Sequence, residues 1–166
     1  MRRTNLKLGS AAVLAVATSV AGMMPADASP APRQHRCATY DNLTEKVIDA
    51  GFTDVPPAGY TVGDLGKWHN QLISQSGEVL ADAVGGSRVD FADGTTLLVY
   101  QWNTDTFKDG AVKEAGLTDG NALLTGEKIS IPAVGISGRY RGMTGFRTFQ
   151  ATAVDGIYNS QLMLCS

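Results

Sequence analysis

A glycine-rich stretch near the C-terminal end constrains the fold more than any other feature of this sequence. The segment GISGRYRGMTGFR, residues 135–147, holds four glycines within eleven residues. A helix does not tolerate this density, because each interior glycine costs about 1 kcal/mol relative to alanine. Glycine reaches positive φ and permits close backbone contacts, so it suits corners and bulges. We predict a loop and corner that redirects the chain into a strand over Phe146–Val154, with a simple glycine-rich hairpin as the alternative.

The remainder of the sequence predicts short strands joined by tight turns. Nineteen glycines and a long succession of short apolar segments are typical of an all-β protein. The expected strands cover residues 37–49, 67–75, 78–91, 95–102, 111–118, 122–131, 146–154 and 157–165. Eight antiparallel strands favour a closed, calycin-like β-barrel, whose interior is wide enough for one small ligand. A β-sandwich is the alternative.

Local patterns refine this assignment. Residues 37–49 alternate poorly and fit a strand or a short helix, and we expect a strand with a break at Ala50-Gly51. Gly85-Gly86 predicts a bulge within its strand. The polar residues 103–110 predict a connection, and Asp119-Gly120 is a hairpin signal.

The first 28 residues have the composition of an export signal. Arg2, Arg3 and Lys7 give a basic start. An apolar run over residues 10–24, too short to span a bilayer comfortably, leads to an A-x-A pattern that ends at Ala28. We predict a signal peptide over residues 1–28, cleaved after Ala28, and a secreted mature protein. An uncleaved membrane anchor is the alternative.

The export route and the segment that follows are also suggested by the sequence. The start resembles the twin-arginine signal RR-x-F-L-K, with Asn5 in place of phenylalanine, although Sec signals also begin with paired arginines. Residues 29–36, SPAPRQHR, predict a disordered, proline-rich polar spacer. A single domain is therefore expected over residues 37–166.

The two cysteines, Cys37 and Cys165, flank nearly all of this domain. In the oxidising environment that an exported protein meets, an even pair predicts a disulfide. Closing a loop of roughly 130 residues contributes about 5 kcal/mol in the chain-entropy treatment. The bond would join the first strand to the last, as a closed barrel requires. A catalytic thiol is the alternative.

Two sequence blocks resemble those of a known protein family. Gly135-Ile136-Ser137-Gly138 followed by Tyr140 is similar to a GGTG segment followed by an aromatic residue. Upstream, residues 61–65 contain Val-Gly-Asp and lead to Trp68, Asn70 and Leu72. This pattern resembles the allene oxide cyclase barrel-like and dirigent-like proteins. The imperfect GGTG, the disulfide between the ends and the unclear first strand are departures from it.

The resemblance implies a barrel that holds a reactive, flexible, mostly apolar substrate in its lumen. It implies cyclisation or isomerisation without a cofactor, driven largely by confinement in one reactive conformer. Asn70 would match an asparagine that helps to hold an ordered water. Asp41 or Glu45 would supply a carboxylate that assists charge delocalisation. The resemblance also implies a homotrimer.

Four aromatic side chains are candidates for the wall of such a lumen, with ordinary core packing as the alternative. They are Trp68, Tyr100, Trp102 and Tyr140. The only histidines in the sequence are His35 and His69, and it holds no G-x-S-x-G motif. We therefore expect neither a metal site nor a serine hydrolase.

Two classes of function fit the sequence. One is a secreted cyclase, isomerase or dirigent-like guide for a small apolar molecule. The other is a non-catalytic exported barrel that binds a hydrophobic ligand, a partner protein or the cell surface. A net charge of −2 gives no indication of nucleic-acid binding, and no stable membrane insertion is expected. An open apolar cavity with Asn70 and a carboxylate facing it would support the enzyme.

Overall fold

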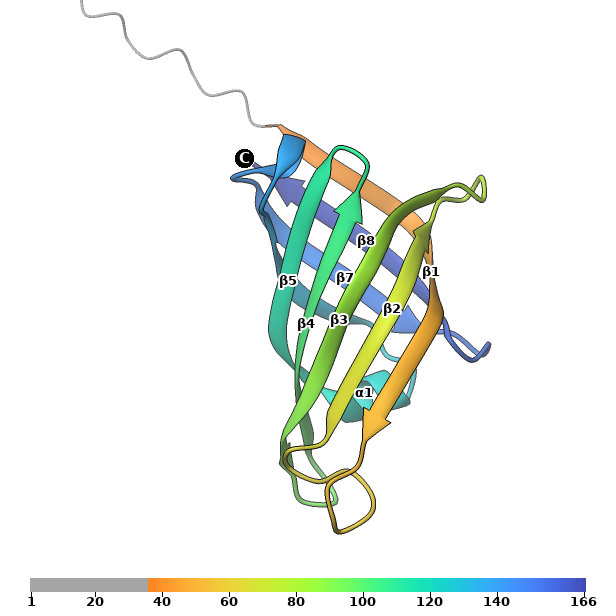
Figure 1. Cartoon of the computed structure of the whole chain (residues 1–166), viewed down its shortest axis with the longest axis vertical. Coiled ribbons are helices and arrows are strands. Elements are labelled where there is room, and N and C mark those ends of the chain that lie inside the picture. The colour runs from red at the N-terminus through yellow and green to blue at the C-terminus, as the bar shows by residue number, and fades with distance from the viewer. Residues whose placement is uncertain (1–35) are drawn as a thin grey trace, which may run out of the picture. The chain divides into compact units, whose positions relative to one another are not determined.

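The computed structural model describes residues 36–166, which form one closed β-barrel of eight antiparallel strands (Figure 1). The strands are β1 (Cys37–Thr53), β2 (Leu65–Ile73), β3 (Val79–Ala92), β4 (Leu97–Phe107), β5 (Gly110–Asp119), β6 (Ile129–Gly135), β7 (Thr144–Ala151) and β8 (Ile157–Cys165). Each strand pairs with the next, and β8 pairs with β1 to close the ring. The predicted eight-stranded barrel is confirmed. The predicted signal peptide (1–28) and nearly all of the predicted spacer (29–36) lie outside the described residues.

The two ends of the barrel differ. At the end where β1 begins and β8 ends, which we call the closed end, buried apolar side chains fill the lumen. These are Leu43, Leu72, Ala81, Ala83, Phe107, Val112, Ala133, Tyr140, Met143, Leu162 and Leu164. At the opposite end, which we call the mouth, the short helix α1 (Gly120–Leu124) lies between β5 and β6 (Figure 1). The lumen is hollow on this side.

A bulge in β1 explains why its sequence alternates poorly. Asn42 has a φ of 54°, and the register with β8 shifts between Tyr40 and Leu43. The side chains that face the lumen are therefore at even positions before the bulge and at odd positions from Leu43 to Val47. A second shift, in the register with β2 between Val47 and Asp49, changes the alternation again, so that Ala50 lines the cavity. The strand then continues to Thr53, so the predicted break at Ala50-Gly51 is wrong.

The predicted connection over residues 103–110 is also wrong, because β4 extends to Phe107. Asn103 and Asp105 continue its alternation and point into the barrel, where both are buried. The predicted bulge at Gly85-Gly86 is wrong too, since the β3–β4 register is continuous there and shifts only between Val89 and Phe91. A Cβ on Gly85 would lie 2.6 Å from the Asn103 Oδ1, so this glycine makes room for that side chain.

The predicted hairpin at Asp119-Gly120 is a helix start instead. The Asp119 carboxylate accepts hydrogen bonds from the backbone N–H groups of Asn121 and Ala122, which caps α1. Strand β6 consequently begins at Ile129 rather than at residue 122. No helix within residues 36–166 has the length and apolar character needed to cross a membrane.

The glycine-rich stretch forms the predicted corner. It contains the end of β6, the 3-10 turn η1 (Gly138–Tyr140) and the start of β7. Gly135 lies against this turn so closely that an added Cβ would be 1.8 Å from the backbone oxygen of Tyr140. The corner thereby places the buried Tyr140 in the closed end.

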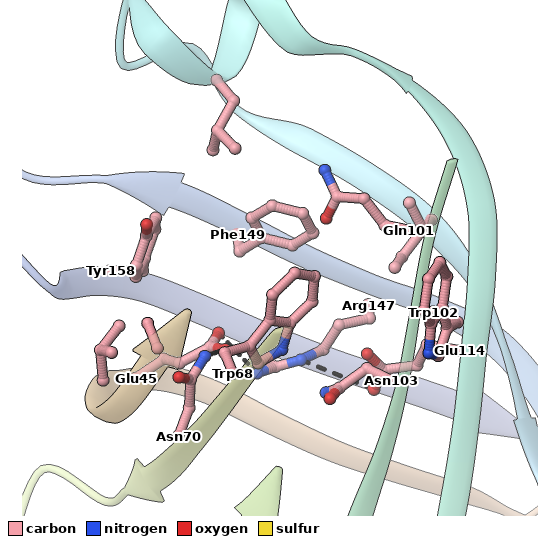
Figure 2. A pocket seen from close by; sticks show the side chains of 14 residues that line it. Glu45, Trp68, Asn70, Gln101, Trp102, Asn103, Glu114, Arg147, Phe149 and Tyr158 are labelled. Atoms are coloured by element: carbon pink, nitrogen blue, oxygen red, sulfur yellow. Dashed lines mark hydrogen bonds and ion pairs between the residues drawn. The ribbon is translucent and has the colours of Figure 1, made fainter. Parts of the chain in front are cut away.

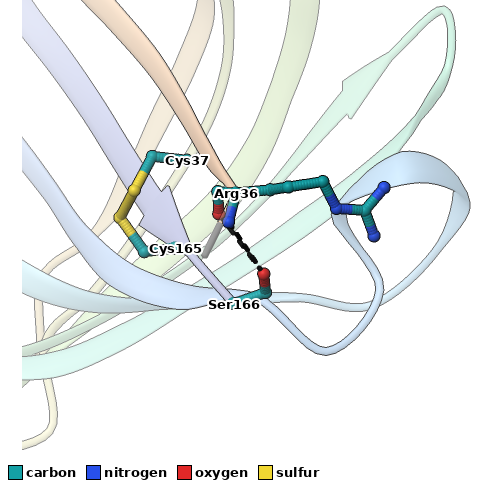
Figure 3. The surroundings of a disulfide bond; sticks show 4 residues. All are labelled: Arg36, Cys37, Cys165 and Ser166. Atoms are coloured by element: carbon teal, nitrogen blue, oxygen red, sulfur yellow. Dashed lines mark hydrogen bonds between the residues drawn. A yellow bond between two sulfur atoms is a disulfide. The ribbon is translucent and has the colours of Figure 1, made fainter. Parts of the chain in front are cut away.

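The predicted disulfide between Cys37 and Cys165 is confirmed (Figure 3). The two residues are direct partners in the register of β1 with β8, 128 positions apart in sequence. Beside them, the Arg36 backbone N–H donates to the Ser166 hydroxyl at 3.2 Å. Covalent and hydrogen bonds thus fasten together the strands that complete the ring.

Candidate functional site

The hollow part of the lumen is a cavity of about 150 Å³ between the apolar closed end and the mouth. Its lining residues are Glu45, Val47, Ala50, Trp68, Asn70, Gln101, Trp102, Asn103, Glu114, Leu123, Ile131, Arg147, Phe149 and Tyr158. Figure 2 shows Phe149 and Tyr158 on one side, with Glu45, Asn70, Asn103 and Arg147 gathered on the other. The cavity therefore has an apolar wall and a polar floor. We use "polar floor" for Glu45, Asn70, Asn103, Asp105, Glu114 and Arg147.

Arg147 of β7 is the centre of the polar floor. Its Nη2 donates to Glu45 Oε2 at 2.9 Å, and its Nε lies 3.6 Å from both Asp105 Oδ2 and Glu114 Oε1. The side chains of Arg147 and Glu114 are only 1% and 2% exposed. Three carboxyl groups therefore surround one guanidinium with almost no water to screen them.

Glu45 is held by three strands. Besides Arg147, it accepts hydrogen bonds from the Asn70 Nδ2 at 2.7 Å and from the Ser160 hydroxyl at 3.0 Å. The register brings these together, because Val47 of β1 pairs with Asn70 and Leu43 of β1 pairs with Ser160. A carboxylate with this many donors is fixed in orientation.

The neighbouring carboxyl groups of Glu114 and Asp105 both have raised pKa values. Burial raises the pKa of Glu114 well above its ordinary value, and the negative charge of Asp105 raises it further. Burial also raises the pKa of Asp105, although Arg147 opposes this. A hydrogen bond between the two carboxyl groups raises the pKa of Glu114 and lowers that of Asp105. Burial therefore favours the neutral form of Glu114 beside a charged guanidinium.

Among the described residues, some polar atoms of the floor have no hydrogen-bond partner. They include Asn70 Oδ1, Asn103 Oδ1 and Arg147 Nη1. The other amide atoms are used, since Asn70 Nδ2 bonds Glu45 and Asn103 Nδ2 bonds Asp105. No group of three or more His, Cys, Asp or Glu side chains within residues 36–166 is arranged to hold a metal ion.

The family to which this barrel belongs is decided by a sequence comparison. The family described as "Allene oxide cyclase barrel like domain" matches residues 44–164, which include strands β2 to β7, most of β1 and nearly all of β8. The chain belongs to the allene oxide cyclase barrel-like family. The search of curated proteins found no match for this chain.

Solved structures agree with this membership. The barrel is similar to AbnU, described as an exo-specific intermolecular Diels-Alderase, with a TM-score of 0.73 and 26% identity over 80% of this chain and 98% of that one. It is similar to the Diels-Alderase AbmU from Streptomyces koyangensis, with a TM-score of 0.72 and 30% identity over 77% of this chain and 63% of that one. The pterocarpan synthase dirigent protein GePTS1, 11% identical with a TM-score of 0.58 over 79% of this chain and 85% of that one, shares the fold. This protein is therefore a cyclase-like barrel.

Within this family member, the structure brings together two of the three predicted catalytic residues. Asn70 and Glu45 are buried, hydrogen-bonded to each other, and line the cavity. Asp41 lies next to the bulge at Asn42 and is exposed, so it does not reach the cavity. The arrangement that the resemblance implied, an asparagine beside a carboxylate, therefore forms with Glu45.

The four aromatic residues predicted to line the lumen lie in different parts of the barrel. Trp68 lines the cavity as expected. Tyr100 does not line the cavity, because even-numbered positions of β4 point outwards. Its ring centroid lies 6.2 Å from that of Trp102. Trp102 borders the cavity through its place in the strand, but its side chain is 37% exposed and packs over Gly86 on the outer surface.

Tyr140 is also not a wall residue, since it belongs to the closed end. It is completely buried, and its hydroxyl donates to Asp109 Oδ1 at 3.0 Å and bonds the Tyr40 hydroxyl at 2.6 Å. Its ring lies 5.1 Å from that of Phe107. Tyr140 thus helps to plug the barrel, and the core-packing alternative holds for it.

Sequence reasoning missed most of the polar floor. Glu114 lies within the expected strand 111–118, where no pattern marked it. Asn103 and Asp105 were hidden because the polar end of β4 was assigned to a connection. Extending the period-2 alternation from Leu97 through Phe107 places residues 101, 103 and 105 on the inner face and would have found them. Arg147 follows a glycine-rich corner, and a lone arginine there carries no pattern.

Proposed function

We propose that this protein is an exported cyclase or isomerase that binds a small, mostly apolar molecule in the barrel lumen and acts on it without a cofactor. The observation that carries the proposal is a single cavity between an apolar wall and a buried, charged floor. A lumen filled by large side chains would have left no room for a substrate. A purely apolar lumen would have offered confinement but no fixed charges.

The apolar wall supplies confinement. Side chains from separate strands, including Trp68, Ile131, Phe149 and Tyr158, border the cavity together with Leu123 of α1. A flexible substrate held in one folded conformer loses its entropy on binding rather than at the barrier, and this effect can supply about 7–11 kcal/mol. Rigid strands suit such a role because their side chains are fixed by packing.

The polar floor supplies fixed charges. Glu45 is positioned to stabilise positive charge that develops in a delocalised substrate, and Asn70 holds it in place through a 2.7 Å hydrogen bond. Arg147 supplies positive charge and an unpaired N–H donor for an electron-rich group. Preorganised groups in a dry site act more strongly than the same groups in water.

The relatives indicate the reaction class. AbnU and AbmU, at 26% and 30% identity, are described as Diels-Alderases. In a Diels-Alder reaction a conjugated diene and an alkene form two new carbon–carbon bonds, and no atom or electron is exchanged with another molecule. We therefore propose ring closure of this kind, or a related isomerisation, for this cavity.

Export completes the proposal. The predicted signal peptide over residues 1–28 directs the protein out of the cytoplasm, and the Cys37–Cys165 disulfide suits an oxidising compartment. Intact-mass measurement of the protein recovered from culture medium tests this, with a mature N-terminus at Ser29 expected. Recovery only from the cytoplasm, with the cysteines reduced, would contradict export. We also propose a homotrimer, which analytical ultracentrifugation can check.

The enzymatic part is tested with linear substrates that carry a conjugated diene and an activated alkene. We expect faster ring closure and one dominant stereoisomer by chiral liquid chromatography with mass spectrometry. Phe149→Trp places a larger side chain in the cavity. The rate should fall at least about tenfold, because the substrate no longer fits beside the indole ring. Phe146→Trp is the matched control, since Phe146 lies on the same strand but is 53% exposed on the outer face.

The outcomes separate the two classes of function. Ligand binding without any acceleration would make the protein a non-catalytic binding barrel. Equal loss of rate in both tryptophan variants would show that the cavity is not where the reaction occurs.

A further inference from the structure

Five buried side-chain atoms of the polar floor have no hydrogen-bond partner within residues 36–166. Two of them, Asp105 Oδ2 and Glu114 Oε1, face the Arg147 Nε at 3.6 Å, so the other three describe what the cavity is built to receive. Arg147 Nη1, Asn70 Oδ1 and Asn103 Oδ1 are buried, have no hydrogen-bond partner within residues 36–166, and belong to residues that line the cavity. Leaving a buried polar atom unpaired costs about 1–3 kcal/mol, so native proteins rarely do it without a reason. A polar group of the ligand would satisfy them.

The three atoms are of complementary kinds. Arg147 Nη1 can only donate, whereas the two amide oxygens can only accept. The amide orientations are set by the network, because Asn70 Nδ2 bonds Glu45 and Asn103 Nδ2 bonds Asp105. A ligand group that matches this floor must therefore accept one hydrogen bond and donate another.

The charge of the polar floor limits which head group the ligand can carry. One guanidinium, that of Arg147, lies within 3.6 Å of three carboxyl groups, those of Glu45, Asp105 and Glu114. The floor therefore already carries excess negative charge, which disfavours an anionic head. A cationic head would face the unpaired N–H of Arg147. A neutral head avoids both conflicts.

We infer that the cavity takes a ligand with an apolar body and a neutral head that has a carbonyl oxygen beside an N–H or O–H donor. The carbonyl oxygen faces Arg147 Nη1, and the donor faces Asn70 Oδ1 or Asn103 Oδ1. This inference rests on the proposed function, because it names the substrate class of the same cavity. A carbonyl conjugated to the reacting alkene would also be polarised by Arg147, which favours ring closure.

A series of one-ring probes tests the head group. Cavities of about 150 Å³ can hold benzene, so benzamide is a suitable minimal ligand. Acetophenone only accepts, benzoate is an anion and benzylammonium is a cation. By isothermal titration calorimetry at pH 7, with the disulfide intact, benzamide should bind about tenfold more tightly than each of the others.

Two variants test whether the preference for benzamide depends on the unpaired atoms of the polar floor. Asn70→Leu removes an acceptor and should reduce the preference of benzamide over acetophenone. Phe149→Leu alters only the apolar wall and should weaken both probes by the same factor. If Asn70→Leu does not fold, the probe series on the wild-type protein still decides the matter.

The results distinguish the inference from the proposed function. Equal affinity for benzamide and acetophenone, or tighter binding of benzoate or benzylammonium, would overturn the neutral head while leaving an apolar lumen. Absence of binding by every probe would overturn the inference and also remove the ligand-binding cavity from the proposed function.

Discussion

Replacing Arg147 by methionine should destabilise the protein in a way that depends on pH. Arg147 is the only cation among the buried charged residues of the described chain, and Glu45, Asp105 and Glu114 surround it. Methionine fills much of the same space but leaves these carboxyl groups facing one another. Any charge that they keep is then uncompensated.

The expected loss is large because the site is dry. Breaking a buried ion pair by removing one partner costs about 3–5 kcal/mol. With a urea m-value of about 2 kcal/mol/M, this corresponds to a midpoint lowered by roughly 2 M at pH 8. Groups whose folded-state pKa is raised stabilise the fold at low pH and lose this contribution as the pH rises through that pKa. The loss should therefore be smaller at pH 5 than at pH 8.

Urea unfolding followed by tryptophan fluorescence at both pH values measures this. Arg88→Met is the control, since the Arg88–Asp90 pair is exposed and screened by solvent, and it should leave the midpoint nearly unchanged. A midpoint for Arg147→Met that falls equally at pH 5 and pH 8 would show that packing, and not charge, explains the effect. A midpoint close to that of the wild type would refute the role of Arg147 altogether.

Three further predictions follow from the same structure. Glu114→Gln should cost little stability, because burial already favours the neutral form of this carboxyl, and it should flatten the decline in stability that the raised pKa of Glu114 causes as the pH rises; a pH series of urea midpoints checks this. Replacing Cys37 and Cys165 by serine should lower stability by up to about 5 kcal/mol, visible in thermal melts, given the 128-residue separation. Gly135→Ala should cost at least about 2 kcal/mol in chemical denaturation, because the added methyl would lie 1.8 Å from the Tyr140 backbone oxygen. A stable Gly135→Ala protein would contradict the tight corner.

The ring of strands could be predicted because its turns are encoded locally. Gly77, with a φ of 85°, lies in the turn between β2 and β3, as the Ser76-Gly77 turn signal indicated. Gly156 lies in the same way in the turn between β7 and β8. The cysteine pair added a contact between the first and last strands, which local patterns cannot supply. These signals depend on neighbours in sequence, so a single sequence reveals them.

The errors have a common physical origin. Asp119 followed by glycine suits a hairpin, yet the same carboxylate is equally able to cap a helix, and only packing decides between them. Asn103 and Asp105 looked like loop residues because polar side chains are rarely buried. They are buried here because the positive charge of Arg147, far away in sequence, offsets the negative charge of Asp105, and Asp105 accepts a hydrogen bond from Asn103.

The candidate site was predictable only in part for the same reason. Asn70 and Glu45 were found through the family resemblance, and β1–β2 pairing makes them neighbours. Arg147 and Glu114 lie on β7 and β5, so their meeting depends on closure of the whole barrel. The sequence contains no local pattern for such a contact.

The position of the C-terminus affects how the protein can be handled. Arg36 and Ser166 lie beside one another near the disulfide, and the strands run from there to the mouth on the opposite side (Figures 1 and 3). A bead, a sensor surface or a fused carrier attached through the C-terminus would therefore leave the entrance pointing into bulk solution. Immobilised binding assays can be built on this geometry without obstructing access to the lumen.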